Sequence, residues 1–217
     1  MKTTRIAIAI LAAVVLPAWA SSTTTFTETF DGPLLDADWR LGTLDEIVSD
    51  GGHPGAYLRN RELDSAVPSP VFVGPTPSPF FGDYRAAGVV SLGLDVNVFS
   101  ASIGVDHTRS VSLVLGSDMG TPDDASDDCQ IAFAGNPLPR PGTGWRSYDF
   151  KIPSDRTRMP SGGVLIGCAG LSPDAAWNAV VTHVTQVQFP FSDPGVFWYF
   201  QIWDVGIDSI RITFSSH

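Results

Sequence analysis

Val89-Val-Ser-Leu-Gly-Leu-Asp-Val-Asn-Val-Phe99 is the stretch of sequence that decides the fold class. Apolar and polar residues alternate along it, which is the period of a β-strand with one buried and one solvent-facing side. The buried side is predicted to carry Val90, Leu92, Leu94, Val96 and Val98, and the other side Gly93, Asp95 and Asn97. A strand of this kind belongs to an antiparallel sheet that packs one face on a core.

The same alternation recurs farther along the chain. It is found at Val111, Leu113 and Leu115, and again at Tyr148, Phe150 and Ile152. Residues 65–81 contain five prolines, so we expect an extended loop there rather than a central strand. The other strand candidates are residues 23–30, 56–59, 187–191, 196–203 and 207–214. This succession of short strands predicts a mostly β, antiparallel sandwich.

One segment departs from this pattern and predicts a short amphipathic helix over residues 173–184. Ser172 suits the N-cap, Pro173 suits the first helical position, and Asp174 places an acid in the first turn. The residues that follow at helical spacing form one apolar stripe: Trp177, Val180, Val181 and Val184.

Two segments resemble the laminin B domain, which is also called laminin IV type A. The first is Pro79-Phe-Phe-Gly-Asp-Tyr-Arg-Ala-Ala-Gly-Val-Val-Ser-Leu-Gly-Leu-Asp-Val96, where an aromatic and Gly-Asp segment, a turn and an alternating strand follow one another. The second is Gly206-Ile-Asp-Ser-Ile-Arg-Ile212, which is similar to the closing strand of that family. The resemblance covers most of residues 26–214. It implies a jelly-roll, galactose-binding-like β-sandwich with one short helix, found in extracellular proteins and without known catalytic activity.

The first twenty residues have the features of a secretory signal peptide. Lys2 and Arg5 form a positive start, an apolar stretch follows, and Ala18-Trp19-Ala20 is a suitable cleavage site. The apolar stretch is too short for a membrane span, which takes roughly twenty residues. We therefore expect residues 1–20 to be removed and residues 21–217 to form a single domain. That domain is expected to be secreted, to the extracellular space or the periplasm.

The charge balance argues against nucleic acid as a partner. The chain has 13 Lys+Arg against 23 Asp+Glu, a net charge of −10, and its only lysines are Lys2 and Lys151. Binding to phosphate groups needs clustered basic side chains, and the arginines here are scattered. No stretch after the signal peptide is long and apolar enough to predict a membrane span.

Export changes how the two cysteines are interpreted. Cys129 and Cys168 are the only cysteines, and each lies in a strand-like stretch. An oxidising compartment favours a disulfide between them, which would close a loop of about 40 residues. The alternative is a pair of buried free thiols.

Residues 196–203 carry large rings on both faces of a predicted strand. One face would hold Phe197, Tyr199, Gln201 and Trp203, with the intervening residues on the other face. A sandwich strand needs rings only on its core face, so the second face is either covered or a binding surface. An exposed row of three rings and an amide would suit a glycan, because rings stack on sugar C–H faces and the amide bonds hydroxyl groups. In that case Tyr199 and Trp203 are accessible to solvent.

Three acids are candidate ligands for one structural calcium ion. Glu28 lies in the first strand and Asp208 at the start of the last, and sandwiches of this shape often place those two strands side by side. Asp31 follows closely, and carbonyl groups of residues 51–56 would add the oxygens that a hard cation requires. The alternative is a pair of solvated acids at strand ends.

Sequence motifs for catalysis are missing: there is no Gly-x-Ser-x-Gly elbow, no His-Glu-x-x-His helix and no Walker loop. We therefore predict a non-enzymatic, secreted binding or structural module that recognises an extracellular glycan or a matrix protein. The alternative is a secreted glycan-active hydrolase on the same scaffold, which would need two carboxylates facing each other across one cleft.

Overall fold

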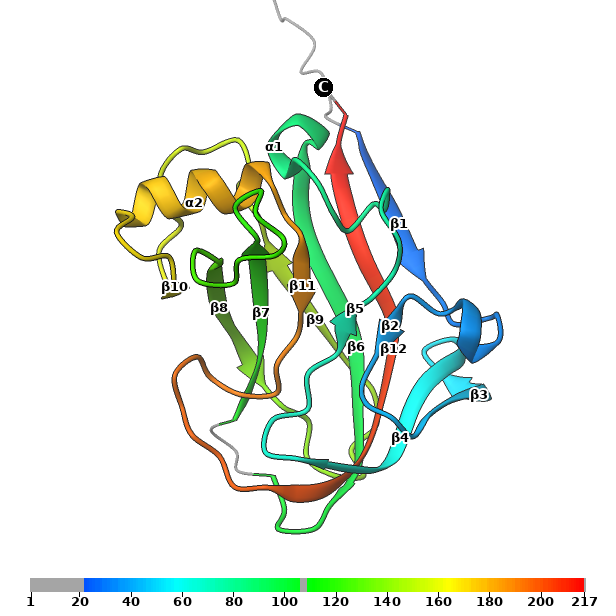
Figure 1. Cartoon of the computed structure of the whole chain (residues 1–217). Helices are drawn as coiled ribbons and strands as arrows, with labels where there is room; N and C mark the ends of the chain where they lie inside the picture. The colour runs from blue at the N-terminus through cyan, green and yellow to red at the C-terminus, as the bar shows by residue number, and fades with distance from the viewer. Residues whose placement is uncertain (1–21, 106–108, 217) are drawn as a thin grey trace, which may run out of the picture.

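The computed structural model describes residues 22–105 and 109–216. Two antiparallel β-sheets pack face to face, with the longer helix near one end, so the predicted jelly-roll sandwich is confirmed (Figure 1). The predicted signal peptide, residues 1–20, lies outside the described residues. Within the described ranges no helix is long and apolar enough to cross a membrane.

The first sheet has six strands in the order β3-β4-β12-β6-β9, with β1 also paired to β12. Its centre is β12, the last strand, which pairs with β6 on one side and with β4 and β1 on the other. The strands are β1 (Thr23–Glu28), β3 (Asp45–Gly52), β4 (Gly55–Ser65), β6 (Val89–Ala101), β9 (Arg146–Lys151) and β12 (Gln201–Ser215).

The second sheet has the order β10-β8-β7-β11-β5-β2. Its β5 lies in the proline-rich segment, for which the sequence predicts a loop; β5 is only two residues long, but it pairs with β11 on one side and β2 on the other. The strands are β2 (Trp39–Arg40), β5 (Val71–Phe72), β7 (Ser110–Ser117), β8 (Cys129–Pro137), β10 (Gly163–Gly167) and β11 (Gln186–Gln188). A short 3-10 helix, η1 (Leu34–Asp36), precedes β2.

The predicted helix is α2 (Pro173–Thr182), which ends slightly before the expected position. The Ser172 hydroxyl accepts a hydrogen bond from the amide of Ala175 at 3.3 Å, so Ser172 is the N-cap. A second helix of one turn, α1 (Tyr84–Ala87), was not expected; it is capped by Asp83 and ends at Gly88. The positive φ of 70° at Gly88 is the left-handed conformation that ends many helices.

The alternation of β6 is confirmed for its inner face, because Leu92, Leu94, Val96 and Val98 are all fully buried. The prediction is wrong at the start of the strand, where Val89 is buried and Val90 is 36% exposed. The pairing register between β6 and β12 shifts between Thr213 and Phe214, and this irregularity turns Val90 outward.

The outer face of β6 is not solvent-facing as predicted. The side chains of Asp95 and Asn97 are buried, with only 3% of Asp95 exposed. The turn between β3 and β4 folds over this face and places His53 against Asp95. The polar residues of the alternation therefore lie in a second, polar layer outside the hydrophobic core.

The predicted disulfide is present between Cys129, at the start of β8, and Cys168, just after β10. It links β10, an edge strand, to its only neighbour in the sheet. The two cysteines are separated by 39 residues, and closing a loop of that size in the unfolded chain costs about 4 kcal/mol of conformational entropy.

We therefore expect replacement of both cysteines by alanine to lower the free energy of unfolding by about 2 to 4 kcal/mol. Denaturant unfolding of the oxidised protein and of the double variant measures this difference. Reductant should destabilise the wild-type protein to a similar extent and leave the variant unchanged. An unfolding midpoint that does not respond to reductant would contradict the prediction.

Candidate functional site

A groove of about 460 Å³ opens at the end of the sandwich where β6 ends and β12 begins. In Figure 1 this end is at the bottom, where the orange-red chain leading into β12 crosses the green loop that follows β6. Two stretches of chain form its walls, the loop after β6 and the segment before β12. The described residues that line the groove are Ile103, Gly104, Val105, Arg109, Phe197, Trp198, Tyr199 and Gln201.

The segment before β12 presents its rings to solvent. Phe197 is 82% exposed, Tyr199 77% and Phe200 70%, values that are unusual for such large apolar side chains. The rings of Phe197 and Tyr199 meet edge to face with centroids 6.1 Å apart. Together these two rings form a raised aromatic edge along one side of the groove.

The expectation that Trp203 is accessible is wrong. Residues 196–200 are not part of a strand, and β12 begins at Gln201. From that point the alternation turns Gln201 and Trp203 to the same side as the core residue Val205, and Trp203 is fully buried. The Trp203 indole donates a hydrogen bond to the Ser65 carbonyl at 2.9 Å. The four predicted ligand-binding residues thus divide into an exposed pair, Phe197 and Tyr199, and a buried pair.

Gln201 still reaches the groove, although it is buried. Its side-chain oxygen accepts a hydrogen bond from the Ile103 amide at 3.0 Å, which ties the loop after β6 to the start of β12. The same two segments continue their pairing through Ser102, whose hydroxyl accepts from the Ile202 amide at 3.0 Å. The two walls of the groove are therefore held together by hydrogen bonds at its inner end.

Arg109 lies between two indole rings at the base of the groove. Its guanidinium carbon is 4.1 Å from the centroid of Trp198 and 4.9 Å from that of Trp203. It also donates a hydrogen bond to the Ala66 carbonyl at 2.8 Å. Cation–π contacts of this kind strengthen when water is excluded, and only 3% of Arg109 is exposed. Arg109 is therefore a fixed part of the floor.

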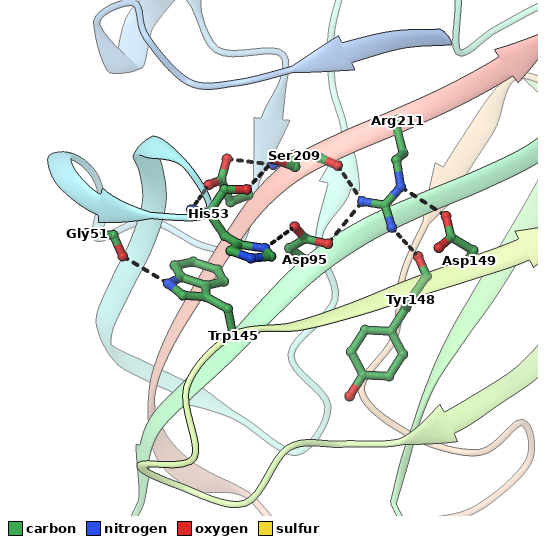
Figure 2. A network of polar contacts seen from close by, with 9 residues as sticks. Gly51, His53, Asp95, Trp145, Tyr148, Asp149, Ser209 and Arg211 are labelled. Atoms are coloured by element: carbon green, nitrogen blue, oxygen red, sulfur yellow. Dashed lines mark hydrogen bonds and ion pairs between the residues drawn. The ribbon is translucent and has the colours of Figure 1, made fainter.

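A polar network that the sequence patterns do not predict covers the outer face of the first sheet (Figure 2). The buried Asp95 accepts from His53 at 2.8 Å and from Arg211 at 3.0 Å, one partner on each carboxylate oxygen. Arg211 also donates to Asp149 at 2.9 Å and to the Tyr148 carbonyl at 3.1 Å. Burial disfavours the charge on Arg211, but the carboxylates of Asp149 and Asp95 outweigh it and leave its pKa raised.

The network extends to the turn between β3 and β4. Trp145 donates from its indole nitrogen to the Gly51 carbonyl at 2.9 Å, and its ring meets that of Tyr57 edge to face at 5.1 Å. The Ser209 hydroxyl donates to the His53 carbonyl at 2.9 Å. The turn is thereby fixed to β6 and β12, and Trp145, the residue before β9, is fixed to the turn.

Asp208 is held inside this layer by hydrogen bonds from the backbone. Its carboxylate accepts from the backbone amides of His53 and Ser209, the second at 2.6 Å. Burial raises the pKa of Asp208 to about 6, although both amides act in the opposite direction.

The other two predicted calcium ligands also have partners within the protein. Glu28 accepts from the Phe30 amide at 3.0 Å, and Asp31 from the Thr29 hydroxyl at 2.7 Å. The strands β1 and β12 do pair, as expected, with Glu28 opposite Ile210. Among the described residues no group of three or more His, Cys, Asp or Glu side chains is placed to hold a metal ion. The calcium site stays a prediction.

Comparisons with known proteins give no family. No protein-family model matches the chain, and no curated protein matches it. A family 30 carbohydrate-binding module of a cellulosomal cellulase from Clostridium thermocellum is 12% identical, covers 92% of this chain and 96% of its own, and has a TM-score of 0.44. An exo-β-agarase is 13% identical with a TM-score of 0.44, and the match covers 85% of this chain but only 24% of the agarase.

The L4b domain of human laminin alpha-2 is 12% identical, with 84% of this chain and 100% of that chain covered and a TM-score of 0.35. The laminin domain and the carbohydrate-binding module are both β-sandwich folds. At these identities and TM-scores, the likenesses carry no argument about function.

Alanine substitutions test which rings of the aromatic segment are buried and which are exposed. Trp203→Ala should lower the free energy of unfolding by about 3 to 5 kcal/mol, because it opens a cavity in the core. Phe200→Ala, at an exposed ring close by, should change it by less than about 0.5 kcal/mol. Thermal or denaturant unfolding of both variants tests this, and equal losses would contradict the arrangement described above.

The buried Asp208 predicts a pH dependence of stability. Its folded pKa of about 6 lies above the ordinary value of 3.8, so between these values the folded protein binds more protons than the unfolded chain. The free energy of unfolding should therefore fall as pH rises from 4 to 6.5, by on the order of 2 kcal/mol. Asp208→Asn, which cannot titrate, is the control and should lack this part of the slope. A wild-type slope equal to that of the variant would rule out the effect.

Calcium addition tests the predicted cation site on the same carboxylate. If Glu28, Asp31 and Asp208 hold an ion, calcium at pH 7 should raise the melting temperature, because it would bind only the folded state. Asp208→Asn should then weaken the rise. Melting curves that are the same in calcium and in chelator would remove the site from consideration.

Proposed function

We propose that this protein is a secreted, non-catalytic binding module whose groove recognises a glycan chain. The observation that supports this most directly is the exposed edge formed by Phe197 and Tyr199 beside a groove with a polar floor. Rings in that position stack on the C–H faces of sugars, and such stacking on the ring face is the main apolar contribution to binding a pyranose.

The distribution of exposed apolar side chains supports the choice of this end of the molecule. Among the described residues four aromatic side chains are exposed, and three of them are Phe197, Tyr199 and Phe200. Three exposed aliphatic side chains lie on the same two segments: Ile103, Val196 and Ile202. A concentrated apolar patch of this kind costs free energy in water and is typical of a binding surface.

The polar groups of the groove fit the same ligand class. Sugar hydroxyl groups need donors and acceptors of fixed direction, and the hydrogen bond to Ile103 fixes the amide of Gln201. The lining also contains the Arg109 guanidinium between its two indoles. Rings, an amide and a guanidinium bind sugars, whereas hydrolysis by the usual route requires a pair of facing carboxylates.

Export to an oxidising compartment is the second part of the proposal. The disulfide between Cys129 and Cys168 is the kind of bond that persists outside the cytosol. The signal peptide expected at residues 1–20 would provide the route. An extracellular glycan, free or attached to a matrix protein, is then the class of partner that the groove meets.

Removal of the exposed rings should weaken glycan binding and leave the fold intact. Tyr199→Ala and Phe197→Ala should each raise the Kd for a bound oligosaccharide by about tenfold, the effect of losing about 1.4 kcal/mol at a contact residue. The melting temperature should stay within a few degrees of wild type, because exposed side chains contribute little to stability. Calorimetric titration with hexasaccharides of β-linked glucose and of galactose measures the affinity.

The matched control is Leu35→Ala, which removes a 90% exposed apolar side chain on η1, outside the groove. It should leave glycan affinity unchanged. If the wild-type protein binds no member of an oligosaccharide panel, glycan recognition is excluded. If new reducing ends appear during incubation, the protein is the hydrolase of the alternative hypothesis.

A further inference from the structure

A second hollow of about 450 Å³ adjoins the groove at the same end of the sandwich. Val105 lines both, so the two are consecutive along the surface. The second hollow is formed mainly by the loop between β8 and β9, and its other lining residues include Leu138, Arg140, Thr143, Trp145 and Arg146. A chain-like ligand lying in the groove would reach this hollow next.

Two exposed arginines distinguish the second hollow from the groove. Elsewhere the guanidinium groups of Arg59, Arg61 and Arg211 are paired with carboxylates. Neither Arg140 nor Arg146 forms an ion pair within the described part of the chain, and both are exposed. Two unneutralised cations beside one hollow are notable in a protein with 13 Lys+Arg and a net charge of −10.

The backbone around these arginines is fixed. The Arg140 carbonyl accepts hydrogen bonds from both the amide and the hydroxyl of Thr143, at 3.1 and 2.7 Å. Arg146 donates to the Pro137 carbonyl at 3.2 Å, and its guanidinium lies 5.7 Å from the ring centroid of Tyr148. The charges are therefore presented from an ordered turn and from the first residue of β9.

Trp145 gives the second hollow a ring of its own. The bond from its indole nitrogen to Gly51 and the edge-to-face contact with Tyr57 hold it in place, as Figure 2 shows for the bond. Trp145 is half-buried and lines the hollow between Thr143 and Arg146. A sugar ring against this indole would lie next to both guanidinium groups.

The overall negative charge does not oppose an anion at this place. At physiological ionic strength the screening length is about 8 Å, so an exposed anion responds mainly to the charges immediately around it. Carboxylates on the neighbouring sheet face, such as Asp95 and Asp204, are already paired with arginines. Among the residues that the structure describes, Arg140 and Arg146 are thus the charged side chains that line the hollow.

We infer that the glycan bound by this protein is an acidic one, with a sulfate or carboxylate group placed between Arg140 and Arg146. This inference rests on the proposed function and specifies its ligand class. Planar guanidinium groups bind sulfate and carboxylate oxygens through paired hydrogen bonds, and Trp145 and Tyr199 would contact sugar rings on either side of Val105.

The test compares oligosaccharides of equal length with and without acidic groups. A neutral galactan hexasaccharide, the same hexasaccharide carrying sulfate groups, and an oligogalacturonate of equal length are titrated at 50 and 500 mM salt. We expect at least one of the two acidic ligands to bind ten times more tightly than the neutral one at low salt. The preference should shrink at high salt because screening weakens exposed charge pairs. The sulfated and uronate arms show which anion is preferred.

Arginine variants test whether the preference for the acidic ligand arises at the second hollow. Arg140→Ala and Arg146→Ala should each reduce the preference for the acidic ligand over the neutral one, measured as the ratio of their Kd values, about three- to tenfold. Arg140→Lys should keep most of the preference if charge alone matters and lose part of it if paired hydrogen bonds matter. Arg158→Ala removes an exposed arginine outside the hollow and is the matched control.

Three outcomes would overturn the inference, and only one of them touches the proposed function. Equal affinity for neutral and acidic ligands would leave glycan binding intact and remove the acidic preference. A loss with Arg158→Ala as large as with Arg140→Ala would show attraction by general charge and not by this hollow. Absence of binding to all three ligands and to other neutral glycans would exclude the proposed function together with the inference.

Discussion

The pairing of β12 with β6 is the interaction on which the rest of this structure depends. β12 lies at the centre of its sheet, with β6 along one side and β4 and β1 sharing the other. Its register decides which side chains enter the core, and the shifts beside Asp204 and Asp208 decide where the alternation is interrupted. Pairing of β12 begins with Gln201 opposite Ser65 of β4, and β6 joins with Ala101 opposite Trp203. The rings before Gln201 therefore stay outside the sandwich, while Trp203 enters it.

A second layer of order lies outside the hydrophobic core. Asp95 is a buried carboxylate, and such a group is tolerated only when its oxygens are well bonded. His53 and Arg211 supply those bonds from a turn and from the end of the last strand. The result is that the turn between β3 and β4 is fastened to the sheet, and Trp145 is fastened to the turn. A buried carboxylate thus helps, through this turn, to fix the ring that lines the second hollow.

The parts that could be predicted from the sequence are those determined by short-range patterns. The inner face of β6 follows from its alternation, α2 from its cap and apolar stripe, and the disulfide from two cysteines in a chain expected to be exported. The start of β12 could not be predicted, because residues 196–203 are apolar on both faces apart from Gln201, and only the partners, residues 65 and 101, decide where pairing begins. The alternation of β6 predicts a solvent-facing Asp95 for the same reason: its partners are 42 and 116 residues away. One local signal does indicate a covered outer face. Gly93 and Gly206 lie on that face, and the space beside their backbone is filled by the side chains of other residues.

The pairing of β1 with the end of β12 has a consequence for how this module would sit in a larger assembly. Thr23 lies opposite Ser215, so β1 begins where β12 ends, at the pole where Figure 1 marks the C-terminus. Gln201 and the groove lie at the other end of β12, about 45 Å away for a strand of 15 residues. A tether or fused partner attached at either terminus would leave from the pole opposite the groove. The fold can therefore be anchored at both ends without obstructing its aromatic edge. That edge would then face away from the surface or partner to which the protein is attached.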